Sequence, residues 1–304
     1  MNKTGTRHVF FCSAASRYYK EDIHGSAANY NGFILLEHSD PFPEKMDQAH
    51  FDPNFIAGLQ VLAKQKKAKL LLIRNRKTDF KSCRLIYVDC LRQRYLTLHS
   101  TLADVAAIRL EYYVNSPDTI WETDPFFVVC TNGKKDKCCA KFGFPVFKFI
   151  ENHDRRVTVF ESTHVGGDRF AANAVCMPAG IYYGRVMVED VDAILEATER
   201  QRIHYPNYRG LATRSFLYQS VECYLREQLQ DFSTSFDFTI DVQEEEEERF
   251  YFRVTANGVH YELRLLKKVI PYPYYLTCKS QKPGNITKYL LETFAEATGS
   301  SATR

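Results

Sequence analysis

The stretch from residue 130 to residue 185 constrains the fold most, because it concentrates reactive side chains between short, strongly apolar runs. Just before it, residues 125–130 form a continuous apolar run that is typical of a strand buried on both faces. Four features are predicted to follow in order: a polar loop at 133–137, a helix at 138–150 that Pro145 should interrupt or restart, a strand at 156–161 and a tight turn at Gly166 and Gly167. A strand at 181–186 and a helix at 188–200 complete the stretch.

This order of strands and helices predicts an α/β fold with a thioredoxin-like central domain. We place that domain at residues 116–205, between an N-terminal α/β segment at 1–115 and a C-terminal α+β segment at 206–304. The elements predicted for the flanking segments are strands at 8–12, 32–37, 69–73, 85–90 and 95–99 with a helix at 53–66, and then a helix at 213–230, strands at 236–242, 250–255, 259–265 and 274–278, and a helix at 285–295.

The bulk composition sets several functional classes aside. A net charge of +3 and a pI near 8.3 are too mild for a nucleic-acid-binding domain, which usually has a pI above about 9. No run approaches the roughly 18 consecutive apolar residues of a membrane helix, and residues 1–7 lack the apolar region of a signal peptide. The nine cysteines are an odd number scattered along the chain, which is typical of a reducing compartment. We therefore expect a soluble, cytoplasmic protein.

Two couples of potential metal ligands lie in the central stretch. Cys130 and Cys139 have eight residues between them, and Cys138 stands beside the second thiol. His164 and Asp168 follow with three residues between them. Four donors arranged as two couples are typical of iron–sulfur and zinc sites.

The residues alone leave the chemistry of these couples open. A 2Fe-2S cluster would place two thiolates on one iron and His164 with a second ligand on the other, an arrangement related to Rieske ligation. A structural zinc site would use the same residues, although eight intervening residues is longer than the usual spacing of a zinc couple. Thiol redox chemistry without metal is a third interpretation, since nearby lysines lower the pKa of a thiol. A purely structural loop is the fourth.

Three other residues near the motifs have competing interpretations. Cys12, at the end of the first predicted strand, is either a thiol facing a site or a small buried apolar residue, and the latter is the commoner fate of a free cysteine. Arg169 and Arg185 flank the second couple. Each either steers an acidic redox partner or pairs with a carboxylate, and we favour the pairing.

Several motifs in this sequence resemble the sucrase/ferredoxin-like family, which contains thioredoxin-like ferredoxins. The motifs that carry the resemblance are residues 130–140 (CTNGKKDKCCA), residues 163–173 (THVGGDRFAAN), Pro178 and residues 182–186 (YYGRV). Residues 11–13, 25–27, 35–37 and 275–278 also look like bacterial members of the family. The resemblance therefore touches most of the chain.

The resemblance implies a thioredoxin-like fold carrying a 2Fe-2S cluster. Family members characterised as ferredoxins bind the cluster through C-x8-C and H-x-G-G-H, which match Cys130, Cys139, His164 and position 168 here. This sequence departs at the last position, where Asp168 replaces the second histidine. An aspartate is a harder, anionic ligand that lowers the reduction potential relative to histidine. Cys138 or Cys176 would be the alternative fourth ligand, leaving Asp168 to pair with Arg169 or to cap a turn.

The function that the resemblance implies is electron transfer with a redox protein as partner. We therefore expect an electron carrier in preference to a catalyst with its own substrate. The competing predictions are a thiol-disulfide oxidoreductase that uses the central cysteines and a zinc-binding or metal-free thioredoxin-like scaffold.

Overall fold

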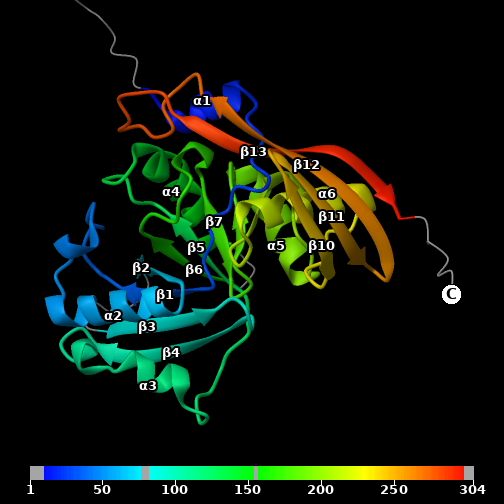
Figure 1. Cartoon of the computed structure of the whole chain (residues 1–304). Coiled ribbons are helices and arrows are strands. Elements are labelled where there is room, and N and C mark those ends of the chain that lie inside the picture. Colours follow the sequence, from blue (N-terminus) through cyan, green and yellow to red (C-terminus); the bar gives the residue numbers. More distant parts are fainter. Residues whose placement is uncertain (1–9, 77–81, 154–156, 298–304) are drawn as a thin grey trace, which may run out of the picture.

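The computed structural model describes residues 10–76, 82–153 and 157–297. Two sheets organise these residues, a nine-stranded mixed sheet and a four-stranded antiparallel sheet that lies beside it (Figure 1). Helices and strands are mixed along the part of the chain that forms the larger sheet, so the α/β class predicted from the sequence is confirmed.

The N-terminal part of the larger sheet forms where apolar runs predict strands. Its elements are α1 (Cys12–Tyr18), β1 (Gly32–Glu37), α2 (Pro53–Gln65), β2 (Ala68–Arg74), β3 (Ser82–Asp89), β4 (Arg94–Thr101) and α3 (Leu110–Asn115). β1 and β2 pair in parallel through the crossover helix α2, and every residue of β1 is buried, as expected for a strand covered on both faces. The carboxylate of Asp52 caps α2 by accepting a hydrogen bond from the N–H of Phe55.

The central part of the sheet has thioredoxin-like topology. Its elements are β5 (Phe126–Cys130), α4 (Lys137–Glu151), β6 (Thr158–Ser162), β7 (Ala174–Met177), β8 (Ile181–Tyr183), α5 (Val191–Glu199) and β9 (Tyr208–Leu211). β5 and β6 are parallel, β7 runs antiparallel to β5, and β8 runs antiparallel to β7. The strand order is β6-β5-β7-β8, with α4 packed on β5 and β6. The thioredoxin-like unit was predicted from three strands, which correspond to β5, β6 and β8, and β7 was not predicted.

One continuous sheet joins the first two predicted segments. The strands lie in the order β4-β3-β1-β2-β6-β5-β7-β8-β9, and the join is the antiparallel pairing of Ile73 with Ser162 and of Arg74 with Glu161. The guanidinium groups of Arg74 and Arg76 also pair with the buried Glu161 carboxylate, at 3.2 and 2.6 Å. The domain boundaries at residues 115 and 205 stay predictions, but strands on either side of each boundary share this sheet, since β9 lies beyond residue 205 and pairs with β8.

The C-terminal part is a helix packed on the smaller sheet. Its elements are α6 (Phe216–Leu229), β10 (Phe238–Glu246), β11 (Arg249–Ala256), β12 (Val259–Pro271) and β13 (Asn285–Glu296). Apolar side chains of α6 and of the sheet, among them Val221, Leu225, Phe252 and Leu263, form one core. The predicted helix at 213–230 and the three predicted strands from 236 to 265 are confirmed apart from their ends.

Three predicted elements are wrong. Residues 285–295 form the strand β13 and no helix, because this segment pairs along the length of β12 and its apolar residues satisfy a strand's alternation as well as a helix's period. Residues 274–278 form a loop in place of a strand. Within the predicted strand 8–12, Cys12 begins α1, while residues 8 and 9 lie outside the described residues.

The helices correct one further expectation. α4 continues through Pro145, which was predicted to interrupt it. The proline lies on the exposed face of the helix, where the carbonyl that loses its N–H partner can be solvated. None of the helices in the described ranges has both the length and the apolar character that crossing a bilayer requires.

Replacing Gly143 by alanine is expected to lower the free energy of unfolding by about 1–3 kcal/mol, the usual effect of overpacking. Gly143 lies in α4 where the helix meets β5, and a Cβ there would overlap the backbone carbonyl of Cys130. Chemical denaturation monitored by circular dichroism measures the change. Gly58→Ala is the matched control, since Gly58 is in α2 with nothing within 4 Å of its added Cβ. Alanine there should stabilise by about 0.5–1 kcal/mol, and equal effects of the two substitutions would contradict the close packing.

Candidate metal centre

The first couple of ligands is positioned by the junction of β5 and α4. Cys130 is the last residue of β5, and Cys139 lies in the first turn of α4. Between them the chain turns through the loop 131–136, and the Asp136 carboxylate caps α4 by accepting a hydrogen bond from the Cys138 N–H at 2.9 Å. The close approach at Gly143 brings α4 against the end of β5. Both thiols are therefore fixed by secondary structure, with Cys130 1% exposed and Cys139 fully buried.

The second couple lies on the loop that follows β6. Gly166 and Gly167 both have positive φ, at 109° and 82°, and the chain then enters the short helix η3 (Asp168–Phe170). This turn reverses the chain, so that His164 and Asp168 face each other with 2.9 Å between Nδ1 and Oδ1. Glycine is required at 167 for a second reason, because a Cβ there would overlap the Arg209 guanidinium.

The two couples meet at one point. The Sγ atoms of Cys130 and Cys139 and a ring nitrogen of His164 all lie within 4.8 Å of one another. Cys139 Sγ is 3.9 Å from His164 Nδ1 and 3.4 Å from Asp168 Oδ1. The structure thus brings together all four side chains that the sequence nominates as ligands. This arrangement of two sulfurs, one imidazole nitrogen and one carboxylate oxygen is able to bind a metal.

Hydrogen bonds within the group shift the pKa values of its members. The hydrogen bond from the Cys139 thiol, helped by His164, lowers the pKa of Cys130 to about 5 although burial opposes the shift. The same hydrogen bond, together with burial, raises the pKa of Cys139. Burial alone would lower the pKa of His164, but its hydrogen bonds with Asp168 and Cys130 outweigh burial and raise that pKa to about 9. Without metal the group therefore favours a thiolate at Cys130 beside an imidazolium.

Arg209 holds the second loop in place. This arginine of β9 is 2% exposed, and it donates to the carbonyl of Gly166 at 3.0 Å and to Oδ1 of Asn173 at 2.8 Å. Asn173 in turn donates to the carbonyl of Gly167 at 2.8 Å, and its own carbonyl accepts from the N–H of Cys130 at 3.0 Å. Arg209 and Asn173 therefore connect both couples. Arg209 was not predicted from the sequence, because it lies outside the motifs that carry the family resemblance and no spacing connects it to them.

The alternatives to Asp168 lie elsewhere. Cys176 is in β7 and packs into the core on the other side of the sheet, with Val186 and Ile194 among its neighbours. Cys138 is adjacent to Cys139 but its sulfur contacts Cys12 and Cys278. Neither thiol joins the first group. Asp168 lies beside this group, with its Oδ1 3.4 Å from Cys139 Sγ and 2.9 Å from His164 Nδ1.

The flanking arginines make hydrogen bonds within the protein. Arg169 forms an ion pair with the buried Glu21 at 2.8 Å, as favoured from the sequence, and no ion pair between Arg169 and Asp168 occurs among the described residues. Arg185 donates to the backbone carbonyl of Ser16 at 3.0 Å and so bonds to backbone in place of a carboxylate.

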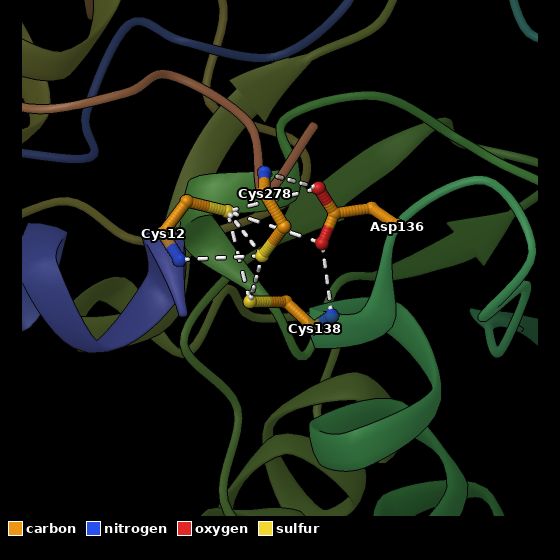
Figure 2. A group of neighbouring side chains, drawn as sticks. All are labelled: Cys12, Asp136, Cys138 and Cys278. Carbon is orange, nitrogen blue, oxygen red and sulfur yellow. Dashed lines mark hydrogen bonds between the residues drawn. The ribbon is translucent and has the colours of Figure 1, made fainter. Parts of the chain in front are cut away.

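Cys12 belongs to a second group of donors. Figure 2 shows the side chains of Cys12, Asp136, Cys138 and Cys278 pointing toward one another, and their donor atoms all lie within 4.8 Å. Cys12 is fully buried, as expected, but its sulfur faces a polar group able to hold a metal ion, which is the interpretation that the sequence disfavoured. The described residues thus contain two candidate metal sites, one that includes Cys138 and one that includes Cys139.

Comparisons with known proteins place the residues of this site in a family match. A family model described as sucrase/ferredoxin-like matches residues 23–210, which include both ligand couples and Arg209. The chain is also similar to the altered inheritance of mitochondria protein 32 of Meyerozyma guilliermondii, with 34% identity over 98 residues that make up 29% of this chain and 35% of the relative. That match spans about a third of the relative's length. No solved structure matches the chain significantly. Because the family model covers more than half of its length, the chain belongs to the sucrase/ferredoxin-like family.

Proposed function

We propose that this protein is a one-electron carrier that binds a 2Fe-2S cluster through Cys130, Cys139, His164 and Asp168. The observation that carries the proposal is the convergence of two buried thiols and an imidazole on one point of a thioredoxin-like domain, with the Asp168 carboxylate in contact with one of the thiols and with the imidazole. The donor set fits the group, since iron–sulfur centres use thiolates and some replace part of them with imidazole. When bound, such a cluster supplies reversible one-electron transfer.

The exposure of the ligands suggests where a redox protein partner docks. The side chain of His164 is 23% exposed, whereas that of Asp168 is 8% exposed and the two thiols are buried. His164 is therefore the ligand nearest to a docking protein. Lys134, Lys135 and Lys137 are exposed on the segment between the two thiols, and their charges favour a partner with an acidic surface.

The same geometry argues against thiol-disulfide exchange at this centre. A catalytic thiolate must reach a disulfide of its substrate, and reactive cysteines are therefore partly exposed. Cys130 has the lowered pKa of a reactive thiol, but both Cys130 and Cys139 are closed off from solvent. The adjacent cysteines Cys138 and Cys139 also belong to different groups, so their two thiols do not form one redox pair.

The proposal is tested by metal and sulfide analysis of protein purified without oxygen. The expected result is about two iron ions and two sulfide ions per chain, with a reducible low-temperature EPR signal. If the analysis instead finds one zinc ion bound to these four residues and no sulfide, the site is a structural zinc site and the cluster proposal is wrong. Protein that stays colourless and free of iron after reconstitution would refute the electron-carrier function.

Replacing Asp168 by histidine is expected to raise the midpoint reduction potential by on the order of 100 mV, because a neutral imidazole replaces an anionic ligand. Protein-film voltammetry measures the change. Asp168→Ala is the companion variant and should lose iron faster to a chelator, since one ligand is missing. If Asp168→His leaves the potential unchanged and Asp168→Ala keeps its iron, the aspartate is not a ligand.

A further inference from the structure

The second group of donors is assembled from three distant parts of the chain. Cys12 is the first residue of α1, Asp136 and Cys138 stand at the beginning of α4, and Cys278 lies in the loop between β12 and β13 (Figure 2). Cys12 and Cys278 are 266 residues apart in sequence. No local turn brings these side chains together, so their convergence is a product of the tertiary fold.

The three sulfurs of this group have the spacing of ligands around a single ion. The Sγ–Sγ distances are 3.6 Å from Cys12 to Cys138, 3.6 Å from Cys12 to Cys278 and 3.3 Å from Cys138 to Cys278. Sulfurs at the corners of a tetrahedron around zinc, with bonds of about 2.3 Å, lie about 3.8 Å apart. The Asp136 carboxylate oxygens lie 3.9 and 4.0 Å from the Cys12 sulfur and occupy the fourth corner. A disulfide would join only two of these three thiols, so it would not account for the third sulfur at a similar distance.

The buried negative charge of Asp136 favours the binding of a cation. Asp136 is 1% exposed and makes no ion pair with a lysine, arginine or histidine in the described parts of the chain. Its hydrogen bonds come from the backbone N–H groups of Cys138 at 2.9 Å and Cys278 at 2.7 Å. A carboxylate packed against three thiols in a buried place is costly unless a cation compensates its charge.

Backbone donors also point at the sulfurs. The N–H of Cys12 donates to the Cys278 sulfur at 3.4 Å, and the N–H of Ser13 donates to the Cys138 sulfur at 3.5 Å. Such hydrogen bonds stabilise negative charge on a sulfur, which is the form in which cysteine binds a metal. The group therefore offers one carboxylate and three sulfurs, of which those of Cys138 and Cys278 accept backbone hydrogen bonds.

We propose that Cys12, Asp136, Cys138 and Cys278 bind one zinc ion as a structural site. Zinc accepts sulfur and carboxylate oxygen in a tetrahedron, and a site with four protein ligands leaves no open position for a substrate. The ion would fasten α1 and the β12–β13 loop to the beginning of α4. This site is distinct from the candidate iron–sulfur centre, to which α4 contributes the adjacent residue Cys139.

Zinc analysis of the full chain and of Cys278→Ala tests the site. Wild-type protein should contain about one zinc ion per chain, and Cys278→Ala should contain at least ten-fold less. Cys176→Ala is the matched control, because this buried cysteine of β7 touches neither group, and it should keep the zinc. Equal zinc content in Cys278→Ala and the wild type, or wild-type protein without zinc after supplementation, would overturn the proposal.

A second measurement does not depend on how a variant folds. Cys278 is the one partly exposed cysteine of this group, so its alkylation by iodoacetamide can be followed by mass spectrometry in the wild-type protein. Bound zinc should slow this reaction at least ten-fold, and a chelator should restore it. An unchanged rate, or a Cys138–Cys278 disulfide in place of zinc, would refute the site. Iron is measured on the same samples, and iron that persists when zinc is lost separates this site from the first one.

Discussion

Protein in which serine replaces Cys130 or Cys139 is expected to contain at least ten-fold less iron than the wild type. Loss of a direct ligand should exceed the 10–100-fold effects on metal affinity that are typical of residues behind the ligands. The serine hydroxyl is a harder donor that stays protonated near neutral pH, so it is a poor substitute for a soft thiolate. Iron per chain and visible absorbance after anaerobic reconstitution measure the loss.

Two controls make this experiment specific. Cys176→Ala removes a buried thiol that lies on the other side of the sheet, and it should leave the iron content unchanged. Cys12→Ala removes a thiol of the second group and should also leave the iron in place. If Cys12→Ala loses the iron while Cys130→Ser keeps it, the cluster belongs to the second group and our assignment of its ligands is wrong.

Replacing Arg209 by methionine is expected to lower the free energy of unfolding by roughly 3–5 kcal/mol. The substitution leaves the carbonyl of Gly166, Oδ1 of Asn173 and the carbonyl of Ser26 without their donor, and each buried unsatisfied acceptor costs about 1–3 kcal/mol. The relief of burying a charge offsets part of this sum, since burial lowers the pKa of Arg209 to about 10. Urea denaturation measures the change.

The same variant should release iron faster to a chelator, because Arg209 fixes the turn between His164 and Asp168. Arg209→Lys keeps the charge but cannot reach all of these acceptors, so its effect should be intermediate. Arg200→Met is the control for loss of an arginine, since Arg200 is 71% exposed and pairs with Glu196 on the surface of α5. That pair should contribute less than about 1 kcal/mol. An unchanged rate of iron release from Arg209→Met would show that the loop does not depend on this arginine.

Most of the larger sheet could be predicted from the sequence because its strands are short runs of apolar residues. The runs at 32–37 and 125–130 correspond to β1 and β5, whose residues are all buried. The predicted order of strands and helices in the central segment agrees with the thioredoxin-like topology, although β7 was not among the predicted strands. That the first segment joins the same sheet could not be predicted. The join depends on two residue pairs between β2 and β6, and these do not alter the pattern of apolar residues in either strand.

The candidate ligands of the first centre could be predicted from the sequence, but the residue that holds their loop in place could not. The spacing of Cys130, Cys139 and His164 along the chain marks them as possible ligands, and the family resemblance gives position 168 its role. Arg209 could not be found in this way, because a buried arginine and an exposed one look alike in a single sequence. Their difference arises only when Gly166 and Asn173 are brought to the guanidinium by the fold.

The second group was beyond prediction for a related reason. Cys138 and Cys139 are consecutive on a helix, where neighbouring side chains point about 100° apart, so one of them had to face away from the first centre. The sequence therefore indicates that Cys138 and Cys139 point in different directions, but it does not show which residues contact Cys138. The partners of Cys138 are Cys12 and Cys278, and the segment containing Cys278 was itself wrongly predicted as a strand.

The distance in sequence between Cys12 and Cys278 has a consequence for biosynthesis. Chains are made from the N-terminus and domains form as they emerge, so the side chains from Cys130 to Asp168 are all available about 110 residues before Cys278 is added. The side chains of the candidate first centre can therefore converge on a nascent chain, whereas the three-sulfur group is complete only after Cys278 has been added. A chain that stops before Cys278 would keep Cys12 and Cys138 without their third thiol, so their accessibility to alkylation would distinguish it from a chain that includes Cys278.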